Sequence, residues 1–149
     1  MAEIEEIIIF AIKKEEEAYT LYTSVAKTTN SPAVKKLMEE IAKDELGHKK
    51  ALKDLSKAEE LLSYNIEQVP DLKLSDPLIA HKIDEKSDIQ SVLTFAMKEE
   101  KAAYDLYIQM SKAATNDKHV TIYQKLAQME LVHKNKLESL YDDMFYSDN

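Results

Sequence analysis

Hydrophobic positions recur every three or four residues along four segments of the chain, the spacing that lines one face of an α-helix. The four stripes are Ile4, Ile8, Ala11, Glu15, Ala18, Tyr22 and Val25, then Val34, Leu37, Ile41, Glu45, His48, Leu52 and Leu55, then Ile89, Leu93, Ala96, Glu100, Ala103, Tyr107 and Met110, and then Ile122, Leu126, Glu130, His133, Leu137, Leu140 and Met144. They predict helices at about 3–28, 32–63, 88–114 and 117–146.

Local signals support two of the helix starts. Ser31 before Pro32 combines an N-cap residue with a proline in the first turn, where the missing N–H costs no hydrogen bond. Ser87 and Gln90 have the spacing of a capping box. The second and third helices are therefore expected to begin at these positions.

The middle of the chain separates the helices into two pairs. Residues 64–86 contain two of the three prolines and show no clear helical period. Two short connections and one long one are typical of a four-helix bundle in which the second hairpin is carried across the end of the first. We therefore expect an all-α fold and a single domain over residues 1–149, with hairpins at about 3–63 and 88–146 and a crossover at 64–86.

The sequence contains a repeat with an offset of 85 residues. Residues 11–55 placed on residues 96–140 without a gap give 15 identical positions of 45. Each copy covers a helix, a short connection and a second helix, so the chain consists of two related helical hairpins. Each copy also contains Glu-x-x-His, once at Glu45 to His48 and once at Glu130 to His133.

Four glutamates and two histidines occupy positions within the apolar stripes, where polar side chains are uncommon. They are Glu15, Glu45, His48, Glu100, Glu130 and His133. Glu15 precedes the first hairpin turn by 15 residues and Glu45 follows it by 15. At ~1.5 Å per residue both lie roughly 22 Å from that turn, so they face each other. Glu100 and Glu130 stand in the same relation to Thr115.

Burial of these carboxylates requires compensation. An ionised carboxylate moved into a core costs several kcal/mol, while a domain has only ~5–15 kcal/mol of net stability. Protonation would also neutralise them, but two divalent cations balance the charge of four carboxylates with none left over, and two neutral imidazoles complete the ligand set. A lone glutamate from each of two helices with Glu-x-x-His from each of the other two is the arrangement of carboxylate-bridged dimetal bundles. Oxygen-rich ligands with imidazole suit iron or manganese, and zinc could occupy the same site.

Composition and charge exclude several classes of partner and of site. The net charge of −8 argues against nucleic acid and against an anionic membrane surface, since both need a basic face. The absence of cysteine excludes disulfides, thiolate zinc sites, iron–sulfur clusters and a cysteine nucleophile. The longest apolar run, Ile7 to Ile12, is far shorter than the ~20 residues that span a bilayer. The acidic start "MAEIEE" does not resemble a secretory signal, so we expect a cytoplasmic protein.

Four motif segments carry a family resemblance. "AIKKEEEAYTLY", "IAKDELGHKKAL", "AMKEEKAAYDLY" and "LAQMELVHKNKL" follow one another in an order that resembles the rubrerythrin branch of the ferritin-like superfamily, over essentially the whole chain. The resemblance implies a ferritin-like four-helix bundle and a non-haem di-iron centre, with the six polar stripe residues as metal ligands. It also implies that Tyr22 and Tyr107 lie beside the metals and donate hydrogen bonds to ligand carboxylates.

The sequence departs from the rubrerythrin pattern in two respects. Rubrerythrins proper have a further glutamate one turn beyond the third-helix ligand, and here that position is Ala103. The resemblance therefore does not extend to a metal that changes ligands during redox chemistry. They also carry a four-cysteine rubredoxin domain, which this chain cannot form. Electrons are therefore expected to come from a separate protein or a small reductant.

The leading functional hypothesis is reduction of hydrogen peroxide at a di-iron centre, with an external electron donor. A ferroxidase or iron-handling protein would use the same ligands but react faster with dioxygen. An oxygen-activating oxidase would need a pocket for an organic substrate, and a catalase of this type would need manganese. In a non-catalytic alternative, the metals only stabilise the bundle.

The long middle connection bears on how the protein assembles. We expect a homodimer, with exchange of hairpins through residues 64–86 as an alternative pairing. His81 and His119 have no symmetric partner and are expected to be surface or capping residues. Gly47, the only glycine, costs ~1 kcal/mol within a helix; close packing or solvent access near the site would explain it, but Val132 at the matching position of the repeat shows that the site does not require glycine.

Overall fold

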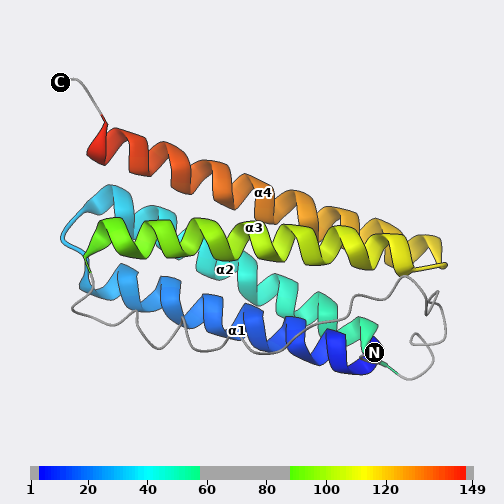
Figure 1. Ribbon diagram of the computed structural model, residues 1–149. Helices are drawn as coiled ribbons and strands as arrows, with labels where there is room; N and C mark the ends of the chain where they lie inside the picture. The colour runs from blue at the N-terminus through cyan, green and yellow to red at the C-terminus, as the bar shows by residue number, and fades with distance from the viewer. Residues whose placement is uncertain (1–3, 58–87, 147–149) are drawn as a thin grey trace.

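Four helices form two antiparallel hairpins in a computed structural model of the protein, which describes residues 4–57 and 88–146 (Figure 1). The helices are α1 (Ile4–Thr28), α2 (Pro32–Leu55), α3 (Ile89–Ala113) and α4 (Asp117–Phe145). Helix α1 packs along α2, and α3 packs along α4. The expected all-α four-helix bundle is therefore confirmed.

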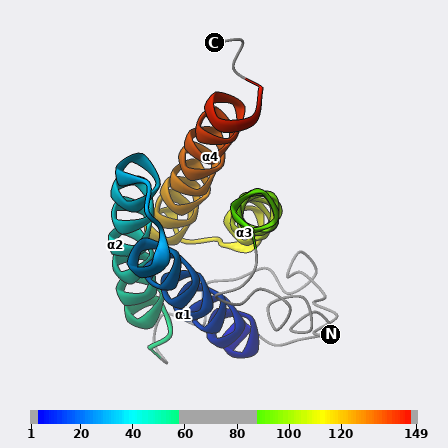
Figure 2. The same ribbon diagram turned by 90° about the vertical axis from the view of Figure 1, so that its left-hand side faces the viewer.

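The end of α2 and the start of α3 lie at opposite ends of the bundle (Figure 1). Both helices therefore run in the same direction, which requires a long connection between the hairpins. The expected crossover at 64–86 lies outside the described residues. Seen along the bundle, the four helices surround a common centre, with α3 beside α1 and α4 beside α2 (Figure 2).

Capping side chains define two of the helix starts. Ser31 Oγ accepts a hydrogen bond from the backbone N–H of Val34 at 3.2 Å, as expected for the N-cap of α2. The N-cap of α3 is Asp88, which accepts from the N–H of Ser91 at 2.7 Å, so the assignment of this start to Ser87 was wrong by one residue. A carboxylate is an equally good acceptor for the free N–H groups of a first turn.

Helix α2 ends earlier than the apolar period suggested. Ser56 forms the C-cap, and its N–H bonds to the carbonyl oxygens of Leu52 and Lys53. The expected end at residue 63 is therefore wrong for residues 56 and 57, while 58–63 lie outside the described residues. A side-chain period cannot locate a helix end that the backbone makes by tightening its last turn.

The core has two apolar clusters, each built from all four helices. One cluster comprises Ile7, Ile8, Ala11, Leu52, Leu55, Leu106, Tyr107, Met110, Ala113, Ala114, Tyr123, Leu126 and Ala127. The other comprises Tyr22, Ala26, Val34, Met38, Ile41, Ala42, Leu93, Ala96 and Leu137. Along each helix, the polar residues of the stripes lie between the members of these two clusters. The polar centre is thus enclosed by apolar packing on either side.

The stripe of α4 differs from the expected one at both ends. His119 was expected to be a surface or capping residue; it is fully buried, so it is not a surface residue, and the N-cap of α4 is Asn116. His119 is four residues before buried Tyr123, and the same helical period continues through Leu126 to Glu130. Met144, expected in the core, is 40% exposed, while Phe145 packs against the second cluster.

Candidate metal centre

Each of the four helices contributes a carboxylate to the middle of the bundle, and α2 and α4 each add an imidazole. The six side chains are those of Glu15 from α1, Glu45 and His48 from α2, Glu100 from α3, and Glu130 and His133 from α4, and all are buried. The i, i+3 spacing places the glutamate and histidine of each pair on one face of their helix. The structure therefore brings together all six residues selected from the sequence.

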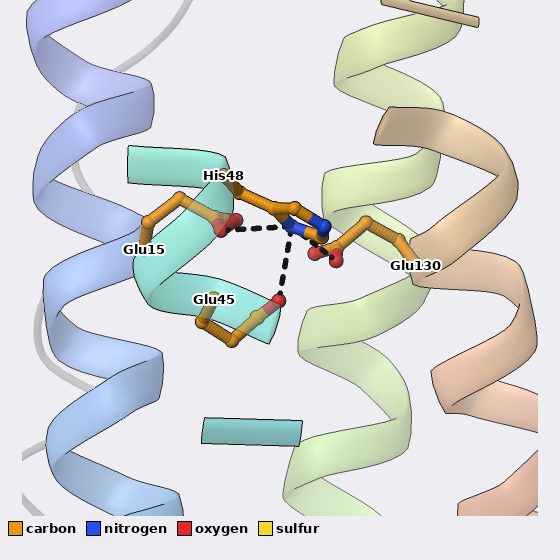
Figure 3. A group of neighbouring side chains, drawn as sticks. All are labelled: Glu15, Glu45, His48 and Glu130. Carbon is orange, nitrogen blue, oxygen red and sulfur yellow. Dashed lines mark ion pairs between the residues drawn. The ribbon is translucent and has the colours of Figure 1, made fainter. Parts of the chain in front are cut away.

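One half of the centre surrounds His48 (Figure 3). Its Nδ1 lies 3.2 Å from Oε2 of Glu15 and 3.1 Å from Oε1 of Glu45. The same nitrogen lies 3.1 Å from Oε1 of Glu130, which comes from the other hairpin. Ligand atoms of these four residues lie within 4.8 Å of one another, close enough to surround one cation.

The other half surrounds His133. Its Nδ1 lies 3.4 Å from Oε2 of Glu100 and 3.4 Å from Oε1 of Glu130, and 3.5 Å from Oε1 of Glu45. These four residues form a second group with ligand atoms within 4.8 Å of one another. Glu45 and Glu130 belong to both groups, so they lie between the two candidate cation positions.

Six buried atoms in this cluster have no hydrogen-bond partner. They are Oε2 of Glu15, Oε1 of Glu45, Nδ1 of His48, Oε2 of Glu100, Oε1 of Glu130 and Nδ1 of His133, one from each of the six residues. The short distances around each imidazole are therefore close charge contacts rather than directed hydrogen bonds, since one N–H cannot point to three oxygens. A buried polar atom without a partner is costly. A divalent cation in each group would give all six atoms a partner, so the residues fit a dimetal centre.

The carboxyl groups respond unequally to burial. Burial raises the pKa of Glu15 and of Glu100 to about 7, although the neighbouring imidazoles oppose the shift. Burial also raises the pKa of Glu45. It acts on Glu130 in the same direction, but interactions with His133 and His48 outweigh it and lower the pKa of Glu130 to about 2.

The imidazoles are surrounded by negative charge. Burial alone would lower the pKa of His48, but Glu130, Glu15 and Glu45 outweigh it and raise the pKa to about 12. Burial of His133 is likewise outweighed, chiefly by Glu100 and Glu130, and its pKa rises to about 11. Without a cation, the cluster therefore balances its charge by retaining protons. A metal ion has to displace them.

Two tyrosines connect the hairpins at the centre. Tyr22 on α1 donates a hydrogen bond to Oε1 of Glu100 on α3 at 2.8 Å, and Tyr107 on α3 donates to Oε1 of Glu15 on α1 at 3.2 Å. Burial, together with the nearby carboxylates, raises the pKa of both phenols further above their ordinary value, so they remain neutral donors. The hydrogen bonds expected of Tyr22 and Tyr107 are thus present. In each case the accepting carboxylate lies in the other hairpin.

One polar neighbour of the cluster was not selected from the sequence. Asp44 Oδ2 lies 2.9 Å from Nε2 of His133, the ring nitrogen that faces away from the carboxylates. A histidine that binds a metal commonly donates its other N–H to a carboxylate. An acidic residue beside Glu45 was therefore a signal that could have identified Asp44.

Gly47 has a simpler environment than expected. It is exposed, and a Cβ atom added there would meet no atom within 4 Å. Close packing therefore does not explain this glycine.

Among the described helices, none is long and apolar enough to cross a membrane. This finding agrees with the short apolar runs in the sequence.

Comparisons with known proteins agree with the geometry. Residues 6–141 match the rubrerythrin family. Among solved structures, the fold is similar to that of a Thermotoga maritima protein provisionally described as a ferritin-like diiron-carboxylate protein, with a TM-score of 0.75, 21% sequence identity, and coverage of 96% of this chain and 97% of that chain. No curated protein gave a significant match. The chain therefore belongs to the rubrerythrin family and has its ferritin-like four-helix fold.

Proposed function

We propose that the protein binds two iron ions at the mid-bundle cluster and reduces hydrogen peroxide with electrons from an external donor. The observation that carries the proposal is the set of six buried ligand atoms without hydrogen-bond partners, arranged in two groups that share Glu45 and Glu130. Membership of the rubrerythrin family supports iron as the metal.

The ligand set favours metals that accept oxygen ligands. Each group offers three carboxylates and one imidazole, a combination that suits iron and manganese, while zinc can also bind it. Two divalent cations with four carboxylates and two neutral imidazoles have no net charge. This neutrality is what makes the buried centre energetically acceptable.

The protein residues have three roles in this proposal. Glu15, Glu100 and the two Glu-x-x-His pairs would hold the metals, and the apolar clusters on either side would exclude bulk water from them. Tyr22 and Tyr107 would fix the orientation of the carboxylates to which they donate. When bound in the ferrous state, the two irons would supply the two electrons that, with two protons, convert hydrogen peroxide into two water molecules.

The electrons have to be returned from outside the chain. With no cysteine, the chain has no iron–sulfur cluster or dithiol that could store them. We therefore propose a separate electron-donor protein or a small reductant that returns the irons to the ferrous state.

Anaerobic stopped-flow mixing tests the choice of oxidant. The ferrous-loaded protein is mixed with hydrogen peroxide in one series and with dioxygen in another, and its oxidation is followed by absorbance. We expect peroxide to react faster. A faster reaction with dioxygen would favour a ferroxidase or iron-handling protein, and no reaction with either would leave the metals a structural role.

Metal content distinguishes the remaining alternatives. Protein purified without added metal and analysed for iron, manganese and zinc should contain iron at two ions per chain. Manganese with oxygen evolution from peroxide would instead favour a catalase. A zinc-loaded protein serves as the control, because zinc fills the same ligands without redox chemistry.

Assembly is a separate proposal. We propose a homodimer, to be tested by light scattering during gel filtration. Exchange of hairpins through residues 64–86 is the alternative, and each centre would then take ligands from two chains.

A further inference from the structure

The two Glu-x-x-His pairs are related by the repeat, but their histidines differ on the side that faces away from the carboxylates. Nε2 of His133 lies 2.9 Å from Oδ2 of Asp44. Within residues 4–57 and 88–146, every ion pair of His48 is made by its Nδ1. The repeat offset of 85 residues places Met129 where Asp44 stands in the first copy, and Met129 has no carboxylate.

The Asp44 contact determines which nitrogen of His133 can bind a metal. Nδ1 of His133 faces Glu45, Glu100 and Glu130, so its lone pair has to point toward them for metal binding. A proton on Nε2, donated to Asp44, leaves that lone pair free and holds the ring in position. The accepting carboxylate also makes Nδ1 a stronger donor to a cation. His48 lacks an equivalent acceptor from the matching residue.

Apart from Asp44 and Met129, the two groups have matching ligands and matching hydrogen bonds. Each has one unshared glutamate that accepts a tyrosine hydrogen bond, and both share Glu45 and Glu130. The difference between Asp44 and Met129 is therefore a chemical asymmetry in an otherwise repeated centre. The Asp44 side chain is 39% exposed, so solvent weakens its effect without removing it.

We propose that the two metal positions are unequal, and that the group of Glu45, Glu100, Glu130 and His133 binds a divalent cation first. Asp44 is the positioning residue responsible, acting through His133. The proposal rests on the proposed metal centre and adds an order of filling to it. Loss of a carboxylate behind a metal-bound histidine commonly weakens metal affinity by about 10- to 100-fold. We expect the lower part of this range because Asp44 is partly exposed.

Cobalt titration of the metal-free protein tests the order of filling. Co²⁺ is added anaerobically while its ligand-field absorption and the heat of binding are recorded. The wild type should take up two ions in steps that differ about tenfold in affinity. In Asp44→Asn the first step should weaken until the two steps merge, and in Met129→Asp the second step should tighten.

A matched control separates this role from general charge or stability. Asp54→Asn removes the same charge from an exposed position on the same helix and should leave both steps unchanged. Circular dichroism and thermal melting of each metal-free variant show whether it is folded. If Asp44→Asn does not fold, Met129→Asp still tests the proposal, because it adds a carboxylate without removing Asp44.

Three outcomes would overturn the proposal. These are two equal steps in the wild type, equal weakening of both steps in Asp44→Asn, and no tightening in a folded Met129→Asp. If the wild type binds no cobalt, iron or zinc, the metal centre itself fails. If it binds two ions with no dependence on Asp44, only the unequal positions fail.

Discussion

The hydroxyl of Tyr22 lies 2.8 Å from Oε1 of Glu100 and donates a hydrogen bond across the interface between the two hairpins. The repeat supplies the reciprocal bond from Tyr107 to Glu15, at 3.2 Å. Each hairpin therefore orients the lone glutamate of the other. The centre depends on the pairing of the hairpins as much as on the ligands within each one.

Removal of the Tyr22 hydroxyl should weaken the centre while leaving the packing in place. Tyr22→Phe leaves a buried carboxylate without its donor, so we expect a loss of about 1–3 kcal/mol in the free energy of unfolding and about tenfold in metal affinity. Urea unfolding and cobalt titration measure the two effects. Tyr19→Phe is the control, since Tyr19 is only partly buried and packs against the apolar cluster. Equal effects of the two substitutions would contradict the role of Tyr22.

Replacement of a glutamate shared by both groups should change the number of bound metal ions more than replacement of an unshared one. Glu45→Gln affects both groups and should reduce binding at both positions, whereas Glu15→Gln affects only one group and should leave one ion bound. Elemental analysis after removal of free metal counts the ions per chain. Glu39→Gln, on the exposed face of α2, should retain two ions. One ion retained by Glu45→Gln and none by Glu15→Gln would show that the groups have been assigned incorrectly.

The metal-free protein should lose stability as pH rises. Glu15 and Glu100 have pKa values of about 7 in the fold against an ordinary 4.5, so their contribution is complete below 4.5 and is lost as pH rises through 7. The imidazole of His48, with a pKa of about 12 against 6.5, contributes fully below 6.5 and loses its contribution as pH rises toward 12. Urea unfolding in the presence of a chelator, between about pH 5 and pH 9, measures the trend.

Bound metal should reverse that trend, because cations and protons compete for the same atoms. Saturating zinc should therefore raise the unfolding free energy more at about pH 9 than at about pH 5. An excess of 100-fold over the dissociation constant corresponds to about 2.7 kcal/mol. Stability of the metal-free protein that increases over this pH range would contradict the protonated state of the cluster. Glu130 differs, because its pKa of about 2 in the fold lies below its ordinary value of 4.5. Its contribution to stability is therefore lost only as pH falls below about 4.5.

Replacement of the only glycine should stabilise the protein. Gly47 lies inside α2, and an added Cβ meets no atom within 4 Å, so Gly47→Ala should raise the free energy of unfolding by about 0.5–1 kcal/mol. Thermal or urea unfolding measures the gain, and metal stoichiometry should not change. Ala102→Gly, at an exposed position in α3, is the reverse substitution and should cost a similar amount. Destabilisation by Gly47→Ala would indicate a constraint on the backbone beside His48.

Within residues 4–57 and 88–146, the sequence determined the four helices, their pairing into hairpins and the set of polar residues in the centre. These features follow from the helical period and from the repeat, since each residue's angle and height on its own helix depend only on its position in the chain. Glu15, Glu45 and His48 could be placed at one level for this reason. The match of Glu45 to Glu130 and of His48 to His133 then extended the centre to the second hairpin.

The contacts between helices were decided by the tertiary structure. The bonds of Tyr22 to Glu100 and of Asp44 to His133 join residues 78 and 89 positions apart. The helical period does not predict which residues of different helices form such a pair. Burial of His119, unlike the hydrogen bond of Tyr22 to a ligand carboxylate, was missed from the sequence. Those features depend on how whole helices rotate and pack against one another. A one-dimensional pattern describes the face of a helix but not the neighbour that this face meets.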